Sequence, residues 1–263
     1  MPFSLTSQIL DVDKFIILPF IFIIGLVFGS FGSVLASRLV SGGPLVFDQS
    51  RCPTCGKVLR PWHLIPLVSW AWQRARCAFC NAKISGFYPA IELATASAFT
   101  FLYLKYGISF EFAIFLGVAF LLIVIITIDI REKIIPDTLQ IALLVLAVIY
   151  GFYFGKWFAA LEGAAAAAML GFGLRWGFFW LKKHESLGMG DVKFLIIAGI
   201  FLGPFTLLPF IFFAGIFGII TGTLWNRLGR GREFPFGPAL AMSLFLCLTV
   251  PEISHFFWQI YDR

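Results

Sequence analysis

Residues 15–39 read FIILPFIFIIGLVFGSFGSVLASRL, an apolar stretch that ends beside a single arginine. A run of about 20 apolar residues is long enough to cross the hydrocarbon core of a bilayer as a helix. The stretch is longer than the apolar part of a secretory signal, and Asp11, Asp13 and a single Lys14 precede it in place of a basic segment. We therefore predict a retained first transmembrane span.

The composition of the whole chain supports the same interpretation. Of the 263 residues, 60% are hydrophobic and only 13% are charged, whereas soluble domains average about 25% charged residues. Eight apolar stretches predict membrane spans, at 15–38, 88–106, 110–128, 138–155, 158–181, 192–203, 205–225 and 236–259. The sixth is short, so it must tilt or pair with the seventh through the break at Gly203-Pro204. The predicted fold class is an all-α polytopic membrane protein with about eight transmembrane helices.

The distribution of basic residues predicts the orientation of these spans. With the N-terminus outside, 14 Lys and Arg fall on one side of the membrane and four on the other. Loops rich in Lys and Arg stay in the cytoplasm, so the long 41–87 loop is predicted to be cytoplasmic. The net charge of +6 then reflects topology, and we expect no nucleic-acid partner. The small residues of 163–173 predict close helix packing.

Two CxxC pairs in the 41–87 loop predict a metal site. Four of the five cysteines belong to these pairs: Cys52, Cys55, Cys77 and Cys80. Four thiolates at this spacing suit a closed, tetrahedral, structural Zn²⁺ site. Gly56 and Asn81 follow the two pairs and tolerate the left-handed turn of a metal knuckle. Disulfides or free thiols are the alternative, although a reducing cytoplasm disfavours disulfides.

The residues between the two pairs are unusually apolar for a loop. Residues 61–72 read PWHLIPLVSWAW. Three tryptophans in so short a segment predict a position in the lipid headgroup region. His63 is expected to lie in this interface and not to serve as a fifth metal ligand, and Cys247 in the last span is expected to be a small buried side chain.

Four acidic residues lie near the ends of predicted spans: Glu92, Asp129, Asp137 and Asp191. Acids near the bilayer interior are rare and usually functional. The third span runs inward and ends at Asp129, and the sixth runs outward and begins at Asp191. The predicted topology therefore brings these two carboxylates to one depth at the cytoplasmic face.

Two adjacent carboxylates can hydrolyse a peptide by acid–base catalysis. One ionised carboxylate activates water while the other, protonated, donates to the carbonyl, and the titration belongs to the pair. Gly188 and Gly190 would let a backbone approach Asp191 closely. Lys193 could act on the pair or reach the headgroups.

The other two acids have weaker functional interpretations. Asp137 follows Pro136 at the start of a span and suits a helix N-cap. Glu92 could orient a substrate, through a free amine, or pair with a basic loop residue.

Two other classes of function compete with hydrolysis. A proton-coupled transporter could use the same acids as a relay, but the outer halves of the spans contain almost no ionisable groups for a continuous pathway. A zinc-bearing assembly scaffold without catalysis would leave the acids unexplained.

In addition, the chain resembles the bacterial type IV prepilin peptidases, which are membrane aspartyl proteases of the GxGD type. Seven motifs in the same order carry the resemblance: GSFGSVLASRL (29–39), the paired CxxC loop, IPLVSW (65–70), YPAIE (88–92), DIREKIIPD (129–137), GMGDVKF (188–194) and PFGPALA (235–241). The catalytic aspartates of the family match Asp129 and Asp191. The resemblance implies an enzyme of the bacterial inner membrane that cuts the basic leader of type IV prepilins or type II secretion pseudopilins after a glycine, at the cytoplasmic face.

Many members of this family also methylate the new N-terminal residue with S-adenosylmethionine. The chain departs from the family pattern at Ser33, Leu64 and Ala75, all in the third that the family associates with methyl transfer. The sequence has no glycine-rich cofactor loop of the kind found in soluble methyltransferases. The predicted domains are a first transmembrane helix (1–40), a four-cysteine zinc loop (41–87) and an aspartyl peptidase core (88–263), with the oligomeric state left open.

Overall fold

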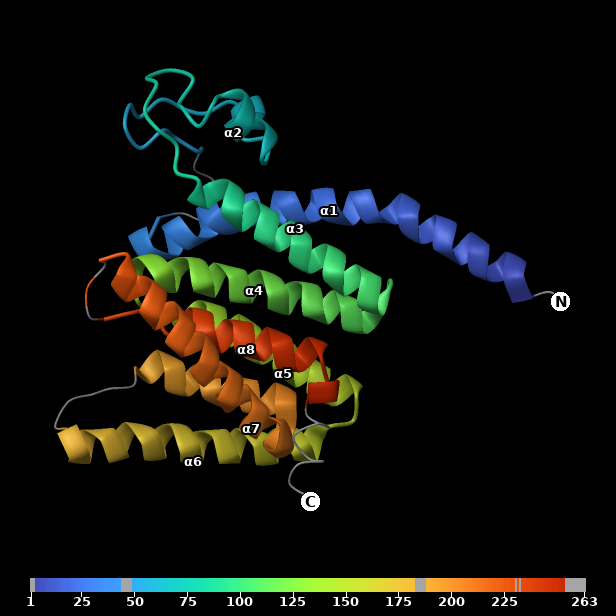
Figure 1. Ribbon diagram of the computed structural model, residues 1–263, viewed down its shortest axis with the longest axis vertical. Helices are drawn as coiled ribbons and strands as arrows, with labels where there is room; N and C mark the ends of the chain where they lie inside the picture. Colours follow the sequence, from blue (N-terminus) through green and yellow to red (C-terminus); the bar gives the residue numbers. More distant parts are fainter. Residues whose placement is uncertain (1–2, 44–48, 183–187, 230, 232, 254–263) are drawn as a thin grey trace. The chain divides into compact units, whose positions relative to one another are not determined.

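The computed structural model describes residues 3–43, 49–182, 188–229, 231 and 233–253 (Figure 1). Nine helical elements lie in these residues: α1 (Phe3–Ser41), η1 (Pro61–His63), α2 (Val68–Trp72), α3 (Phe87–Tyr106), α4 (Phe110–Glu132), α5 (Asp137–Tyr153), α6 (Trp157–Lys182), α7 (Met189–Arg227) and α8 (Gly237–Thr249). Within the described residues, β-type pairing is limited to two isolated bridges, Arg51 with Val58 and Arg76 with Lys83. The predicted all-α class is confirmed.

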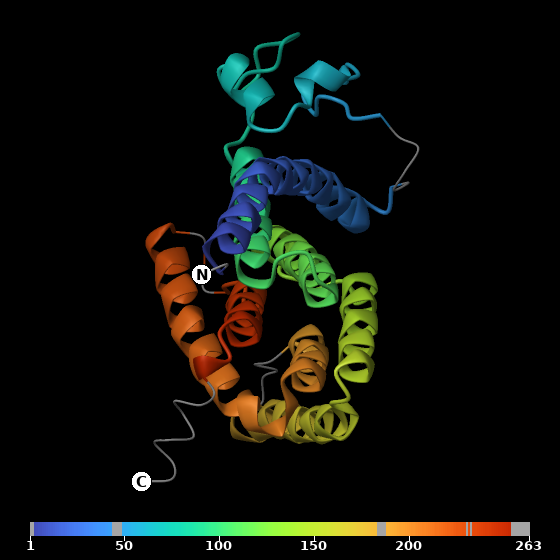
Figure 2. The ribbon, with the colours of Figure 1, turned by 90° about the vertical axis from the view of Figure 1, so that its right-hand side faces the viewer.

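The first of two compact units comprises residues 1–124. In it α1 and α3 lie side by side (Figures 1 and 2). A Cβ on Gly29 of α1 would lie 2.6 Å from the Cα of Glu92 in α3, so the two backbones touch at this point. The loop between these helices contains η1 and α2. Helix α1 begins earlier than the predicted span at 15–38.

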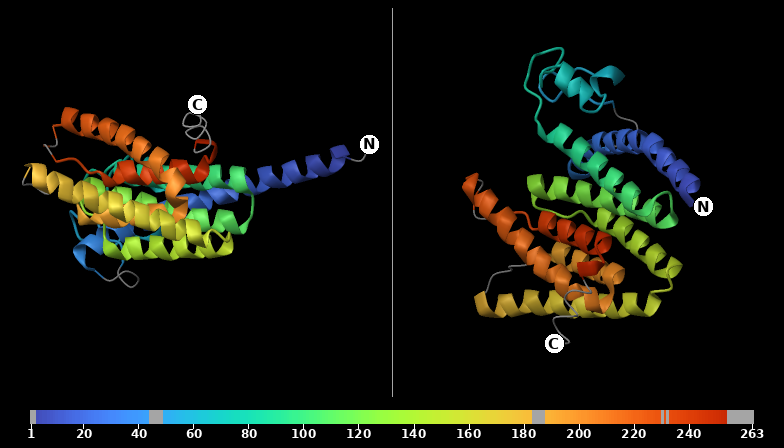
Figure 3. Two further views of the ribbon diagram at one scale, coloured as in Figure 1. Left: turned by 90° about the horizontal axis from the view of Figure 1, so that it is seen from below. Right: turned by 45° about the vertical axis from the view of Figure 1, so that its right-hand side comes forward.

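The second unit comprises residues 125–263 and begins within α4. In this unit α7 packs against α5, α6 and α8 (Figure 3). A Cβ on Gly163 of α6 would overlap the carbonyl oxygen of Gly199 in α7, and only glycines allow this approach. The close packing predicted for 163–173 is therefore confirmed.

The predicted break between the sixth and seventh spans lies inside α7. Gly203 has φ 70° and ψ 176°, which is not helical, and Pro204 follows it. Proline cannot continue the hydrogen-bond pattern of the preceding turn. The two predicted spans thus correspond to the two helical halves of α7, which meet at a kink at Gly203.

Five of the described helices are long and apolar enough to cross a membrane, and α5 and α8 are shorter apolar helices of 17 and 13 residues. The chain is thus polytopic, as predicted. The predicted last span, 236–259, is interrupted: α8 ends at Thr249 because Val250 precedes Pro251, and a residue before proline is disfavoured in the helical conformation, whereas Glu252 and Ile253 are helical again. Residues 254–259 of that prediction lie outside the described part of the chain.

Candidate active site and metal centre

Asp129 lies in the last turn of α4 and is buried, with 4% of its surface exposed. Its Oδ2 accepts a hydrogen bond of 2.7 Å from the backbone N–H of Gly237. Gly237 is the first residue of α8, and the first amides of a helix have no partner within the helix. The α8 N-terminus therefore supplies both a donor and a favourable dipole to this carboxylate.

Gly237 is required by this geometry. A Cβ at this position would lie 2.7 Å from Oδ2 and 2.9 Å from Cγ of Asp129, closer than atoms can pack. Gly237 belongs to the PFGPALA motif, but the sequence alone predicted no role for it. The local signal was the Gly-Pro pair that opens a helix, because proline is favoured in the first turn.

Asp191 occupies the first turn of α7, three residues after the N-cap Gly188. The backbone N–H of Gly188 donates to the Asp191 carboxylate. This is one half of a capping box, in which the third helical residue reaches back to the N-cap amide. A Cβ on Gly188 would lie 3.3 Å from Asp191 Oδ2, so this glycine leaves the carboxylate accessible.

The structure brings Asp129 and Asp191 together within the second unit. Their carboxylates are close enough for the charge of one to act on the other. Asp129 is buried and Asp191 is half-buried. Convergence of two acids 62 residues apart is what the predicted topology required.

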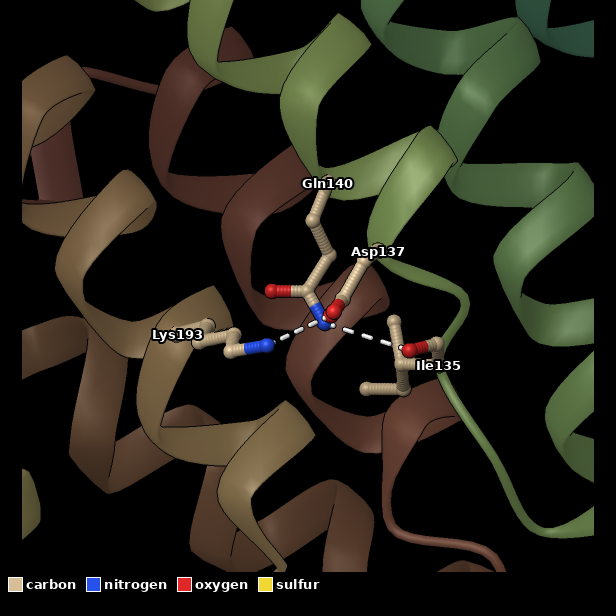
Figure 4. Close-up of polar contacts among 4 residues, drawn as sticks. All are labelled: Ile135, Asp137, Gln140 and Lys193. Atoms are coloured by element: carbon tan, nitrogen blue, oxygen red, sulfur yellow. Dashed lines mark hydrogen bonds and ion pairs between the residues drawn. The ribbon is translucent and has the colours of Figure 1, made fainter.

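Asp137 and Lys193 form an ion pair with each other at 2.7 Å (Figure 4). The predicted N-cap role of Asp137 is wrong, because Pro136 is the N-cap of α5 and Asp137 is its first helical residue. The predicted effects of Lys193 on the aspartate pair or on headgroups remain predictions beside this contact. The side chains of Lys193 and Asp137 are 46% and 64% exposed, so the pair adds little stability.

Glu92 belongs to the first unit and is buried. Its Oε2 accepts the backbone N–H of Leu67 at 2.8 Å, and its carboxylate also receives a hydrogen bond from Ser30. Leu67 has φ 58° and precedes α2, so Glu92 holds a strained point of the loop against α3. The structure thus shows a bond from Glu92 to the loop backbone, and among the described residues it shows no ion pair of Glu92 with a basic side chain.

The four loop cysteines form one cluster whose Sγ atoms all lie within 4.8 Å of one another. Tetrahedral zinc bound to thiolates at about 2.3 Å places sulfurs about 3.8 Å apart, and the Sγ atoms of Cys52 and Cys80 are 3.8 Å apart. Backbone N–H groups of Cys55 and Thr54 point at Cys52 and lower the pKa of its thiol to about 6. A thiolate at neutral pH is the form that binds zinc, so the residues present fit the ion.

Each half of this cluster is a tight turn of the predicted kind. Gly56 and Asn81 follow the CxxC pairs with φ of 69° and 58°, the left-handed conformation predicted for both. His63 lies outside the cluster, and its Nδ1 accepts the backbone N–H of Arg60 at 3.4 Å. Trp62 and Trp72 are 57% and 86% exposed, and a position in the headgroup region remains a prediction.

The residues that depart from the family pattern have local structural roles. Ala75 has φ 57°, a conformation in which a glycine would be unstrained. Ser33 is buried in α1 and donates to the carbonyl of Ser30 at 2.8 Å. Leu64 is the C-cap of η1.

Comparisons with known proteins cover most of the chain. Residues 23–106 match the bacterial peptidase A24 N-terminal domain, and residues 115–223 match the type IV leader peptidase family. No solved structure matches.

Curated relatives are similar over most of their length. A Bacillus subtilis protein named prepilin leader peptidase/N-methyltransferase is 34% identical, with 85% of this chain and 90% of that protein covered. Proteins of the same name from Pseudomonas aeruginosa and Neisseria gonorrhoeae are 35% and 31% identical, with 78% and 89% of this chain and 72% and 91% of those proteins covered.

Proposed function

The chain belongs to the type IV leader peptidase family, and from that premise we propose that Asp129 and Asp191 are its catalytic pair. The protein is a multi-pass protein of the bacterial inner membrane and an aspartic endopeptidase for type IV prepilins or type II secretion pseudopilins. Cleavage follows a glycine at the end of the basic leader. The observation that carries the assignment is the meeting of two carboxylates at the N-termini of α7 and α8. None of the relatives reported above is named as a transporter.

The pair would hydrolyse the leader junction by acid–base catalysis. The ionised carboxylate takes a proton from a water molecule, whose oxygen attacks the scissile carbonyl carbon, while the protonated carboxylate donates to the carbonyl oxygen. Collapse of the tetrahedral intermediate breaks the C–N bond: the departing nitrogen takes the proton that the first carboxylate removed from water, and the second carboxylate recovers its proton from the hydroxyl that becomes the new carbonyl. Gly237 holds Asp129 in place by its N–H, and Gly188 leaves the approach to Asp191 open.

The substrate determines where this chemistry must happen. A basic leader stays on the cytoplasmic side, and the excess of Lys and Arg in the 41–87 loop supports the same side for the zinc loop and the active site. The apolar helix of a prepilin would lie beside the spans in the lipid, so that its leader junction reaches the aspartates at the membrane surface. The same proposal places residues 61–72 in contact with the lipid headgroups.

Methylation of the new N-terminal residue is the second proposed activity, supported by the names of the relatives. S-adenosylmethionine would supply the methyl group. Zinc would have a structural role, because four thiolates close its coordination shell. In this family, methyl transfer is associated with the N-terminal third of the chain, which contains this loop.

The test is incubation of the purified full chain with a prepilin in detergent, followed by intact mass of the products. Loss of the leader mass reports cleavage, and a further gain of one methyl group with added S-adenosylmethionine reports methylation. Asp129→Asn and Asp191→Asn should each abolish cleavage while the protein still folds. Normal processing by either variant would remove the assignment.

A further inference from the structure

The side chain of Gln140 is a buried amide with one unpaired half. Gln140 lies one turn into α5, and 3% of its surface is exposed. Its Nε2 donates to the carbonyl oxygen of Ile135 at 3.3 Å, whereas its Oε1 is buried and has no hydrogen-bond partner among the described residues. A flipped amide would set two oxygens against each other, so the bond to Ile135 fixes this orientation.

An unpaired buried oxygen is unfavourable, and each one in a folded protein requires an explanation. A methionine would fill nearly the same space without this cost. Such unfavourable local choices concentrate at functional sites. The position of Gln140 is therefore informative.

The amide of Gln140 lies between the chain segments that carry the two aspartates. Ile135 belongs to the loop that follows α4 and therefore follows Asp129. Gly190 directly precedes Asp191, and a Cβ on it would lie 3.4 Å from Ile135 Cβ and 3.6 Å from Gln140 Nε2. Figure 4 shows the amide nitrogen turned to Ile135 and the amide oxygen turned to the opposite side, the side from which Lys193 of α7 approaches.

The first turn of α7 lacks a side-chain cap. Its N-cap is Gly188, which has no side chain to serve as an acceptor, although its carbonyl oxygen accepts the N–H groups of Asp191 at 3.1 Å and Val192 at 3.3 Å. The buried amide of Gln140 lies against this turn at Gly190. Asp191 stands on that turn, so whatever fixes the turn fixes the carboxylate.

We propose that Gln140 is a positioning residue for the aspartate pair, and this rests on the proposed peptidase function. Its Nε2 holds the loop after α4 and lies against Gly190 in the first turn of α7, while its Oε1 is turned toward α7. The one amide then sets the separation of Asp129 and Asp191. It touches neither the substrate nor the reacting atoms.

The experiment compares Gln140→Met with the parent in prepilin cleavage and in thermal unfolding. The expected result is a kcat about tenfold lower, the rate equivalent of about one hydrogen bond, with KM within twofold and an unfolding temperature equal to the parent's or higher. The pH profile of kcat should shift as well, because the separation of two carboxylates sets their coupled titration. If Gln140 only supports the fold, a change in kcat or in the pH profile should be accompanied by a lower unfolding temperature.

A matched control exists in the other unit. The Oγ1 of Thr100 in α3 is also buried, without a hydrogen-bond partner in the described part of the chain, and Thr100→Val removes it at constant shape. This variant should keep the parent's kcat and pH profile.

The remaining outcomes separate the two proposals. The positioning role is overturned if Gln140→Met keeps the parent's kcat, or if its activity and its unfolding temperature fall together. If Asp129→Asn is inactive in the same assay, the proposed catalytic pair still stands. A parent that cleaves no prepilin overturns both.

Discussion

Replacement of Gly237 by alanine tests the contact that holds Asp129. The new methyl group would lie 2.7 Å from Oδ2 of that carboxylate, so either α8 or the last turn of α4 must move. Movement breaks the 2.7 Å hydrogen bond from the Gly237 N–H. The substitution therefore acts on a proposed catalytic group without changing its chemistry.

The magnitude follows from the two parts of the contact. A hydrogen bond to a charged group contributes about 1.5–3 kcal/mol, and forcing a methyl group into a packed site costs about 1–3 kcal/mol. If the whole hydrogen-bond energy is lost from the transition state, kcat falls by about 10- to 100-fold. The overpacking should appear as a lower unfolding temperature.

The assay is single-turnover cleavage of a prepilin in detergent, with thermal unfolding of the same samples. Gly215→Ala in α7 is the matched control, because a Cβ there meets nothing within 4 Å and alanine is favoured over glycine in a helix. Cleavage by Gly237→Ala within twofold of the parent would refute the reasoning. So would an equal loss in Gly215→Ala.

Three further predictions concern the loop and the surface. Ala75→Gly should stabilise the zinc loop by about 1 kcal/mol, because alanine is strained at φ 57°; unchanged protease resistance of the loop would contradict this. Atomic absorption should find zinc in the parent and in Cys247→Ala but not in Cys52→Ser, and equal zinc in all three proteins would exclude the metal site. Lys193→Ala should change stability by less than about 1 kcal/mol, since its ion pair with Asp137 is exposed. Cleavage by Lys193→Ala should stay within twofold, and a tenfold loss would show that the lysine acts on the aspartates.

The sequence predicts those features that depend on local chemistry. Apolar runs locate the helices because the bilayer admits little else, and Gly203-Pro204 locates the bend of α7. The left-handed turns at Gly56 and Asn81 follow from residue types that tolerate them. Membrane topology alone brings Asp129 and Asp191 to one face.

Contacts between distant residues escape such reasoning. Gly237 lies 108 residues from Asp129, and no pattern in either segment predicts that the Gly237 N–H donates to the Asp129 carboxylate. The ion-pair partner of Lys193 is Asp137, 56 residues away, whereas the sequence suggested only the aspartate pair or the headgroups. The predicted span extends past the end of α8 because the apolar residues continue beyond Pro251, whereas helix α8 stops before this proline.

The bond between Glu92 and Leu67 has a consequence for biogenesis. All four zinc ligands leave the ribosome before Glu92 does, because they precede it in the chain. The bond between Glu92 and Leu67 can form only after α3 has emerged. The loop therefore gains this attachment to α3 when all four zinc ligands are already available for metal.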